Sequence, residues 1–330
     1  MSKEKVISGI RPTGNLHLGN YYGAVRSFIE MQNNYDCMFF IADWHSLTTN
    51  PRPDDIRRSV RTILTEYLAC GINPKIAPIY AQSDVPEVLE LYLYLNMNAY
   101  LGDLERCTTF KEKARKQPDN VNAGLLTYPT LMAADVLIHR ATKVPVGKDQ
   151  EQNMEMMRRY ARRFNQMYNV EFFPEPANFS LSDKAIKIPG LDGSGKMGKS
   201  EGNCIYLTDD PKVIKKKVMK AVTDNGPTEP NSPKPDVIQN LYTFLEIVST
   251  PETYKYFDDK WNNCEQQFYG ELKKQLADDI VRFTDPIRER IREIESDSTL
   301  LDRVLAEGAE AARSSARTTL TEVRHIIGFK

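Results

Sequence analysis

One stretch near the start of the chain decides its fold: Gly9-Ile10-Arg11-Pro12-Thr13-Gly14-Asn15-Leu16-His17-Leu18-Gly19-Asn20-Tyr21-Tyr22-Gly23. The apolar run 6–10 precedes it and predicts a buried strand. Apolar residues at helical spacing follow it, from Ala24 to Met31. A strand, a glycine-containing turn and a helix together point backbone N–H groups at an anion. The stretch therefore predicts an anion-binding turn, although an ordinary turn with a chance histidine fits it equally well.

The composition is that of a globular protein. The chain has 330 residues, of which 41% are hydrophobic and 27% charged, so one large domain or two ordinary ones are expected. The formal net charge is −1, so any nucleic-acid contact needs a local basic face. No apolar run reaches the length of a membrane span, and the N-terminus lacks the apolar core of a signal peptide. Five scattered cysteines predict reduced thiols without a metal site, in a cytoplasmic protein without membrane association.

Strands and helices alternate through the first part of the chain. Further strands are predicted at 37–43, 78–81 and 143–146, and helices at 54–71, 89–101, 128–137 and 150–168. This alternation predicts an α/β fold with a doubly wound, mostly parallel, Rossmann-like sheet. The polar cluster Asp43-Trp44-His45-Ser46 follows the second strand, at the end where such sheets bind ligands. The leucine- and tyrosine-rich helix 89–101 suits a partner subunit and the protein core equally.

The second part of the chain is helical by pattern. One helix is predicted to begin at Asp210-Pro211, another at Asp285-Pro286, and the last to span 301–327. We therefore expect a Rossmann-type domain at 1–200, with a helical and loop insertion near 89–125. An all-α domain follows at 201–330, with its last helix packing back on the first domain. The basic segment 107–122 fits either a solvated surface or a mobile loop that contacts phosphates.

Four motifs carry a family resemblance, in the expected order. His17-Leu18-Gly19-Asn20 resembles the HIGH signature of class I aminoacyl-tRNA synthetases, in the HxGN form of the bacterial tryptophanyl-tRNA synthetases. Asp135 in its Met-Ala-Ala-Asp setting and Gly147-Lys148-Asp149-Gln150, as GxDQ, are similar to the same family. Lys196-Met197-Gly198-Lys199-Ser200 resembles its KMSKS loop, and Phe110-Lys111 its phosphate-approaching pair.

A competing motif overlaps the last of these. Gly193 to Ser200 satisfies G-x-x-x-x-G-K-[ST], the pattern of P-loop kinases and NTPases. No strand end precedes it, and Glu201-Gly202-Asn203 opens a helix poorly, so the context disfavours a P-loop. Arg11 stands where many bacterial family members carry glutamine, which leaves details of ATP binding open. The alternatives are tyrosine specificity, a P-loop phosphotransferase and a non-catalytic RNA-binding relative.

The resemblance implies ATP-dependent ligation of L-tryptophan to tRNA(Trp) through a tryptophanyl-adenylate, with release of AMP and pyrophosphate. It implies ATP and Mg²⁺ as cofactors, a homodimer, and an anticodon-binding role for 201–330. The implied catalytic residues are His17, Asn20, Lys111, Lys196 and Lys199. The implied ATP contacts are Gly9, Arg11, Thr13, Gly19, Asn20, Gly147, Asp149, Ile188, Lys196, Met197, Lys199 and Ser200. The implied tryptophan contacts are His45, Tyr128, Met132, Asp135 and Gln150.

Asp135 is expected to set the choice of tryptophan. It lies among apolar residues, where a carboxylate needs a donor, and the resemblance implies that the indole N–H is that donor. An ion pair with Arg140 is the alternative. His139 and His325 match no motif and are expected to be structural. The tRNA phosphates are expected to contact basic residues of the helical domain at 215–217 and 288–292.

Overall fold

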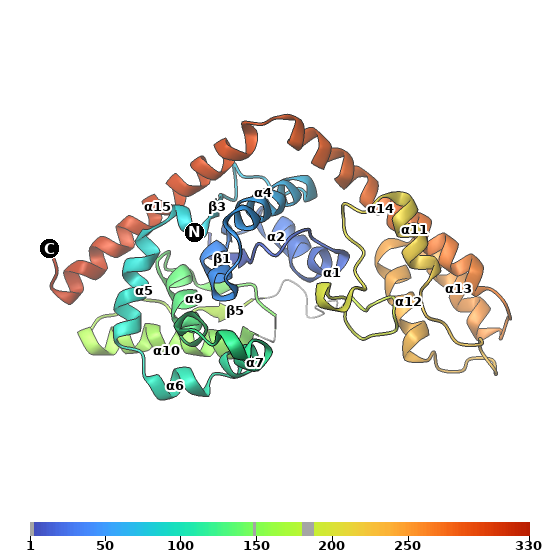
Figure 1. Cartoon of the computed structure of the whole chain (residues 1–330), viewed down its shortest axis with the longest axis horizontal. Coiled ribbons are helices and arrows are strands. Elements are labelled where there is room, and N and C mark those ends of the chain that lie inside the picture. Colours follow the sequence, from blue (N-terminus) through green and yellow to red (C-terminus); the bar gives the residue numbers. More distant parts are fainter. Residues whose placement is uncertain (1–2, 148–149, 180–187) are drawn as a thin grey trace. The chain divides into compact units, whose positions relative to one another are not determined.

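The computed structural model describes residues 3–147, 150–179 and 188–330 (Figure 1). Its contacts divide the chain into two compact units. Unit 1 comprises Met1–Gly14, Ser27–Asp183 and Asp297–Lys330, and unit 2 comprises Asn15–Arg26 and Lys184–Ser296. These bounds differ from a division at residue 200, because each unit takes in a segment from the other part of the chain. The roles expected for 1–200 and 201–330 stay predictions.

A five-stranded parallel sheet forms the centre of unit 1. Its strands are β1 (Lys5–Ile10), β2 (Asp36–Ile41), β3 (Ile79–Ala81), β4 (Lys143–Val144) and β5 (Ala177–Asn178). Their spatial order is β3-β2-β1-β4-β5, and all neighbours are parallel. This is the order of a doubly wound fold, with its switch point between β1 and β4. The predicted fold class is confirmed, whereas β5, which is short and exposed, had no apolar pattern to predict it.

Side chains of the strands alternate between two apolar layers. On one face Phe39 stacks on Phe28 with ring centroids 4.6 Å apart, and Tyr67 meets Phe28 edge-on. On the other face Ile7 and Phe40 join a buried core that also contains residues of the helices. Residues that alternate in the sequence therefore anchor both helical layers to the sheet.

The helices of unit 1 largely follow the predicted ranges, with ends shifted by no more than a residue for 54–71, 128–137, 150–168 and 301–327. The helix predicted at 89–101 breaks into α5 and α6. The basic segment is a helix, α7, rather than a loop, because Thr108–Lys116 lacks Gly and Pro and is rich in good helix formers. The helices are α2 (Arg26–Met31), α3 (Asp43–Ser46), α4 (Pro53–Cys70), α5 (Glu87–Met97), α6 (Leu101–Arg106), α7 (Thr108–Lys116), α8 (Ala123–Leu126), α9 (Tyr128–Leu137), α10 (Glu151–Tyr168) and α15 (Leu300–Ile327).

The last helix, α15, covers the edge strand β3 of the sheet (Figure 1). A Cβ atom on Gly308 would collide with the backbone carbonyl of Ile79, so the helix approaches the strand as closely as glycine allows. Ion pairs continue the contact beyond the sheet, where Arg313 and Arg317 both reach Glu87 of α5. The C-terminal helix is thus a structural part of unit 1.

Unit 2 is helical around its own core. The most deeply buried large side chains of that core include Trp261, Tyr242, Phe244 and Phe257. The predicted helix start at 285–286 is wrong, because Pro286 lies inside α14. The proline removes one backbone hydrogen bond of the helix, and the buried residues around it keep the helix packed. No helix in the described part of the chain is long and apolar enough to cross a membrane. The helices are α1 (Leu18–Asn20), a π-helical turn (Tyr21–Val25), α11 (Pro211–Met219), α12 (Asp236–Val248), α13 (Pro251–Asn262) and α14 (Tyr269–Ser296).

Candidate active site

A buried cluster of three polar side chains lies in unit 1. Asp135 comes from α9, His45 from α3, and Gln82 from the turn that follows β3. The carboxylate lies 2.9 Å from Nε2 of His45 through Oδ2, and accepts a 2.6 Å hydrogen bond from Nε2 of Gln82 through Oδ1. Burial raises the pKa of the Asp135 carboxyl, and the hydrogen bond with His45 opposes that rise. Sequence analysis found Asp135 and His45 but missed Gln82.

The predicted alternative partner of Asp135 is wrong. Arg140 lies 3.8 Å from the carboxylate of Glu322 and stacks on the ring of Phe172. The donors that satisfy Asp135 come instead from within the cluster, so the carboxylate does not depend on a ligand to be partnered. Each carboxylate oxygen has a second acceptor site, which leaves capacity for a further donor.

Tyr128 links this cluster to a lysine of α7. The Tyr128 ring lies with its centroid 4.2 Å from that of His45, and Nζ of Lys113 lies 3.3 Å from the Tyr128 centroid. Burial and, to a smaller extent, the charge of Arg11 lower the pKa of Lys113 to about 8. Lys111, the residue singled out from the sequence, is exposed on α7. Residues two positions apart lie on different faces of a helix, so only one of these lysines can face Tyr128.

The start of α10 holds the third motif of the sequence. Gln150 is the N-cap of α10, and its backbone N–H donates to the carbonyl of Gly147 at 2.9 Å. Its Oε1 accepts from Nδ2 of the buried Asn153 at 2.8 Å. Asp149 lies outside the described residues. Met132 is half-buried on α9, next to the face that carries Asp135.

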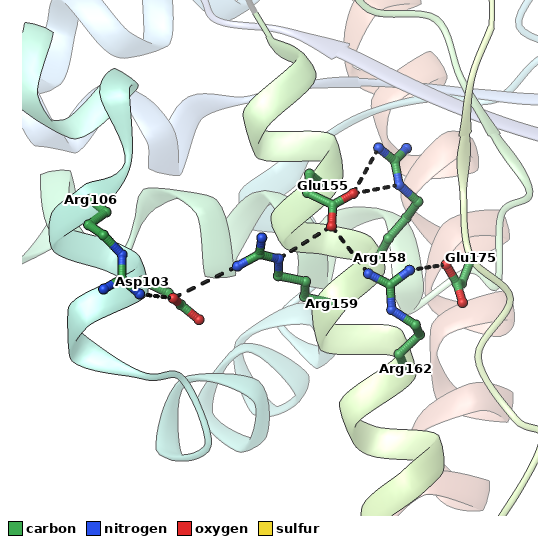
Figure 2. A network of polar contacts seen from close by, with 7 residues as sticks. All are labelled: Asp103, Arg106, Glu155, Arg158, Arg159, Arg162 and Glu175. Carbon is green, nitrogen blue, oxygen red and sulfur yellow. Dashed lines mark hydrogen bonds and ion pairs between the residues drawn. The ribbon is translucent and has the colours of Figure 1, made fainter.

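An ion-pair network connects α10 to α6 and to the segment before β5. Figure 2 shows the carboxylate of Glu155 contacting several arginines of the same helix, including Arg159 and Arg162. Arg159 also reaches Asp103 of α6 at 3.8 Å, and Arg162 reaches Glu175 before β5 at 2.6 Å. Exposed pairs of this kind contribute little to stability one by one. The network joins α6, which leads into α7, to the helix that Gln150 begins.

The end of β1 and the turn after it carry three of the predicted ATP contacts, Gly9, Arg11 and Thr13. The backbone N–H of Thr13 donates to the carbonyl of Arg11 at 2.9 Å, and Gly14 has a φ of +88°. A Cβ on Gly9 would lie 2.6 Å from the ring of Phe40 in the neighbouring strand. Glycine is therefore required at position 9 by the packing of the sheet as well as by any ligand above it.

Unit 2 contains the first motif of the sequence. His17 is buried and precedes α1, and its backbone N–H donates to Oδ1 of Asn20 at 3.2 Å. The ring Nδ1 has no hydrogen-bond partner among the residues described. Burial lowers the pKa of His17 to about 4, with smaller contributions from Lys199 and Lys196, so the ring is neutral at physiological pH. A Cβ on Gly19 would lie 2.9 Å from this ring, which explains the glycine.

The second motif belongs to the same unit and packs against the first. Leu18 donates its backbone N–H to the carbonyl of Ile205, which joins the first motif to the strand-like segment after the loop. Within the loop the N–H of Met197 donates to the carbonyl of Ile188 at 2.8 Å. Asn203 accepts from the N–H of Gly198 at 2.9 Å and donates to the carbonyl of Lys196 at 3.2 Å. Lys196 and Ser200 are exposed, and Lys199 is half-buried.

The geometry of this loop disagrees with a P-loop. The residues after Gly198 form a single 3₁₀ turn, Lys199–Glu201, which ends at Gly202 with a φ of +67°. A P-loop instead opens an α-helix whose N-terminus faces the phosphates. Each unit therefore contains its own group of candidate residues: a polar and aromatic group in unit 1, and a histidine–lysine group in unit 2.

Comparisons with known proteins agree on one family. The model of the family described as tRNA synthetases class I (W and Y) matches residues 2–285. A tryptophan–tRNA ligase of Porphyromonas gingivalis is 73% identical over 327 residues, which cover 99% of this chain and 100% of that protein.

Solved structures show the same similarity. The tryptophanyl-tRNA synthetase of Campylobacter jejuni, complexed with ADP and tryptophan, has a TM-score of 0.87 and 30% identity, covering 98% of this chain and 100% of its own. The tryptophanyl-tRNA synthetase of Mycoplasma pneumoniae has a TM-score of 0.83 and 31% identity, and the match covers 99% of this chain and 98% of its own. A tyrosyl-tRNA synthetase of Archaeoglobus fulgidus, at 18% identity and a TM-score of 0.68, shares the fold.

Proposed function

The chain belongs to the class I tRNA synthetases for tryptophan and tyrosine, and on that premise we propose which of its residues ligate L-tryptophan to tRNA(Trp). The reaction has two steps. The tryptophan carboxylate attacks the α-phosphorus of ATP and pyrophosphate leaves, which gives tryptophanyl-adenylate. The terminal ribose hydroxyl of the tRNA then takes the acyl group and AMP leaves. Tyrosine specificity and phosphotransfer by a P-loop are not favoured.

The tryptophan side is assigned to the polar and aromatic group of unit 1. The supporting observation is the buried carboxylate of Asp135, which is held by two donors and has room for a third. The indole ring offers one N–H donor on an otherwise apolar surface, and Met132 and Tyr128 provide apolar contact for it. Gln150 and His45 are the remaining proposed contacts of tryptophan.

The phosphate side is assigned to the histidine–lysine group of unit 2. His17 is neutral, so its ring donates a hydrogen bond to a phosphate oxygen without adding charge. Lys196 and Lys199 supply positive charge where the leaving pyrophosphate gains negative charge. Lys111 was proposed from the sequence for the same role, and the structure adds Lys113 as a candidate. Further proposed ATP contacts are Gly9, Arg11, Thr13, Gly19, Asn20, Gly147, Asp149, Ile188, Met197 and Ser200.

Mg²⁺ is proposed only as the ion that enters with ATP. The described residues contain no group of three His, Cys, Asp or Glu side chains that could hold a metal ion. The oxygen ligands that Mg²⁺ prefers come readily from substrate phosphates and water. A location in the cytoplasm is also proposed, and the five free cysteines support it.

Tryptophan-dependent exchange of pyrophosphate into ATP tests these assignments. Lys196→Ala is expected to slow the exchange by about a hundredfold or more, because it removes a charge that acts on the transition state. Tryptophan binding, measured separately by calorimetry, should change little. Lys255→Ala, an exposed lysine on α13, is the matched control. Exchange by Lys196→Ala within twofold of the unchanged protein would remove the loop from the catalytic assignment.

A homodimer is proposed from an apolar stripe on α5. Leu89, Leu93 and Met97 are 43%, 52% and 76% exposed and, at a spacing of four residues, share one helix face. Exposed apolar rows of this kind mark interaction surfaces. Leu93→Asp is expected to give monomers of about half the dimer mass in sedimentation velocity, whereas Ile76→Asp, an exposed residue elsewhere in unit 1, should not. A protein that sediments as a monomer before any substitution would refute the proposal.

Two of the basic residues proposed to contact tRNA have partners within unit 2. Lys217 donates to the carboxylate of Asp209, and the buried Arg288 donates to the carbonyl of the same residue, so both are held inside unit 2. Exposed charges on α11 and α14 are the better candidates, and the salt dependence of tRNA binding should become shallower for each one removed. Within the proposed ranges these are Lys215, which also pairs with Asp278 at 2.8 Å, Lys216, Arg290 and Arg292.

A further inference from the structure

Gln82 is the one member of the buried cluster for which neither the motifs nor the proposed reaction accounts. Its side chain is 1% exposed, and it lies on the turn directly after β3. Asp135 and His45 are 2% and 3% exposed, so the three side chains form one buried polar group. Polar groups this deeply buried are nearly always hydrogen-bonded, and each exception needs an explanation.

The side-chain amide of Gln82 has a hydrogen-bond partner for its nitrogen but none, among the residues described, for its oxygen. The carboxylate of Asp135 can only accept, so the nitrogen of the amide must face it, at 2.6 Å. The opposite orientation would bring two oxygens together at the same distance. The amide oxygen, Oε1, is buried and has no hydrogen-bond partner in the described part of the chain. Oε1 of Gln82 is therefore a buried acceptor that is held in place next to Asp135 and can accept a hydrogen bond from a ligand.

The proposed function supplies a donor for this oxygen. The tryptophan side chain has a single N–H donor, and the proposed binding group places the indole beside Asp135. Resting on that function, we propose that Gln82 is a specificity-determining residue whose Oε1 accepts a hydrogen bond from the indole N–H. Asp135 holds the amide in the orientation that presents this oxygen, and the two residues recognise the same proton together. An analogue without the N–H leaves the Gln82 acceptor unpaired, which is a strong source of discrimination.

A role as a mere support for Asp135 makes a different prediction. A support acts only through the carboxylate, so its removal has no further effect once Asp135 itself is changed. An acceptor that contacts the indole loses its own interaction in either background, as long as the second variant keeps an acceptor for the Gln82 amide. Asp135→Asn does so, because its side-chain oxygen still accepts from the amide nitrogen. A double-mutant cycle separates these two possibilities.

The measured quantity is the ratio of kcat/KM for tryptophan to kcat/KM for 3-benzothienylalanine, each obtained from pyrophosphate exchange with that amino acid as the only one present. The analogue replaces the indole N–H by sulfur and keeps the shape of the ring. Gln82→Met, which keeps the length of the side chain, is expected to lower this ratio about tenfold or more, both alone and in the Asp135→Asn background. Gln82→Asn, which withdraws the amide by one methylene, is expected to lower it as well and serves if Gln82→Met does not fold.

Gln32→Met is the matched control. Gln32 is also a buried glutamine of unit 1, but both ends of its amide are partnered, by the carbonyl of Gly71 and the N–H of Asn73. Its substitution should leave the ratio unchanged. An unchanged ratio in Gln82→Met, or an effect that vanishes in the Asp135→Asn background, would overturn the proposal. Absence of tryptophan-dependent exchange in the unaltered protein would instead refute the proposed function itself.

Discussion

Lowering the pH from 7.5 to 5.5 is expected to destabilise unit 1 through His139. The imidazole is 2% exposed, and its nitrogens lie 3.1 Å from the hydroxyls of Tyr80 and Ser315. Burial lowers the pKa of His139 from 6.5 to about 3, with a smaller effect of Lys5. The folded pKa is thus below the unfolded one. The stabilising contribution of the neutral His139 is therefore fully present above pH 6.5, and it is lost as the pH falls toward the pKa of His139 in the folded protein.

The size of the effect follows from the two pKa values. At pH 7.5 a histidine is almost neutral in both states, so protonation contributes little. At pH 5.5 the unfolded chain has bound the proton and the folded chain has not, which lowers the free energy of unfolding by about 1.4 kcal/mol. That loss is a sizeable fraction of the stability of an ordinary domain.

The two tryptophans of the chain allow each unit to be followed separately. Trp44 lies in unit 1 and Trp261 in unit 2, so a Trp261→Phe background leaves a fluorescence reporter of unit 1 alone. Urea unfolding is compared at pH 7.5 and 5.5, with and without His139→Gln. The loss of stability at pH 5.5 should be about 1.4 kcal/mol smaller in His139→Gln. His325→Gln, an exposed position, is the control. Equal losses with and without His139 would refute the reasoning.

Three further outcomes are expected. Gly308→Ala should lower the free energy of unfolding of unit 1 by about 1–3 kcal/mol, because the added methyl group collides with the backbone of β3. Gly270→Ala is the control and should leave that free energy unchanged, because nothing lies within 4 Å of a Cβ there. Gly198→Ser should leave pyrophosphate exchange within about twofold, because a Cβ there makes only ordinary contacts, and a larger loss would show a need for glycine. Asp135→Asn should reduce the preference for tryptophan over phenylalanine by about tenfold or more in kcat/KM, and an unchanged preference would contradict its assigned role.

The parts of the fold that the sequence could predict are those with strong periodicity. The helices 54–71 and 128–137 have clear apolar faces or start signals, and both are confirmed. The start assigned at Pro286 failed because proline marks a helix beginning only by its local chemistry, and packing of α14 overrides it. The strand β5 has two exposed residues, and nothing in its sequence distinguishes it from a loop.

The candidate site was predictable where motifs concentrate its chemistry and not where packing alone creates it. His17 and Lys196 stand in recognisable patterns. Gln82 does not, because its position beside Asp135 results from a sheet that brings two distant segments together. The role of Lys111 stays a prediction, and the contact of Lys113 with Tyr128 could not be predicted because the sequence does not show which face of α7 turns toward that ring. Arg140, the alternative partner of Asp135, is wrong because the sequence does not show which way a side chain turns after the end of α9.

The helix that covers β3 is made long after the strand itself. Unit 1 begins with the first residues of the chain, yet it requires residues 297–330, so the whole of Lys184–Ser296 is synthesised in between. At about 5–20 residues per second, the ribosome takes on the order of ten seconds over that interval. During this time β3 is an uncovered sheet edge, open to pairing with other chains. The arrival of α15 closes that edge, and a chain released before this point would lack the cover on which unit 1 depends.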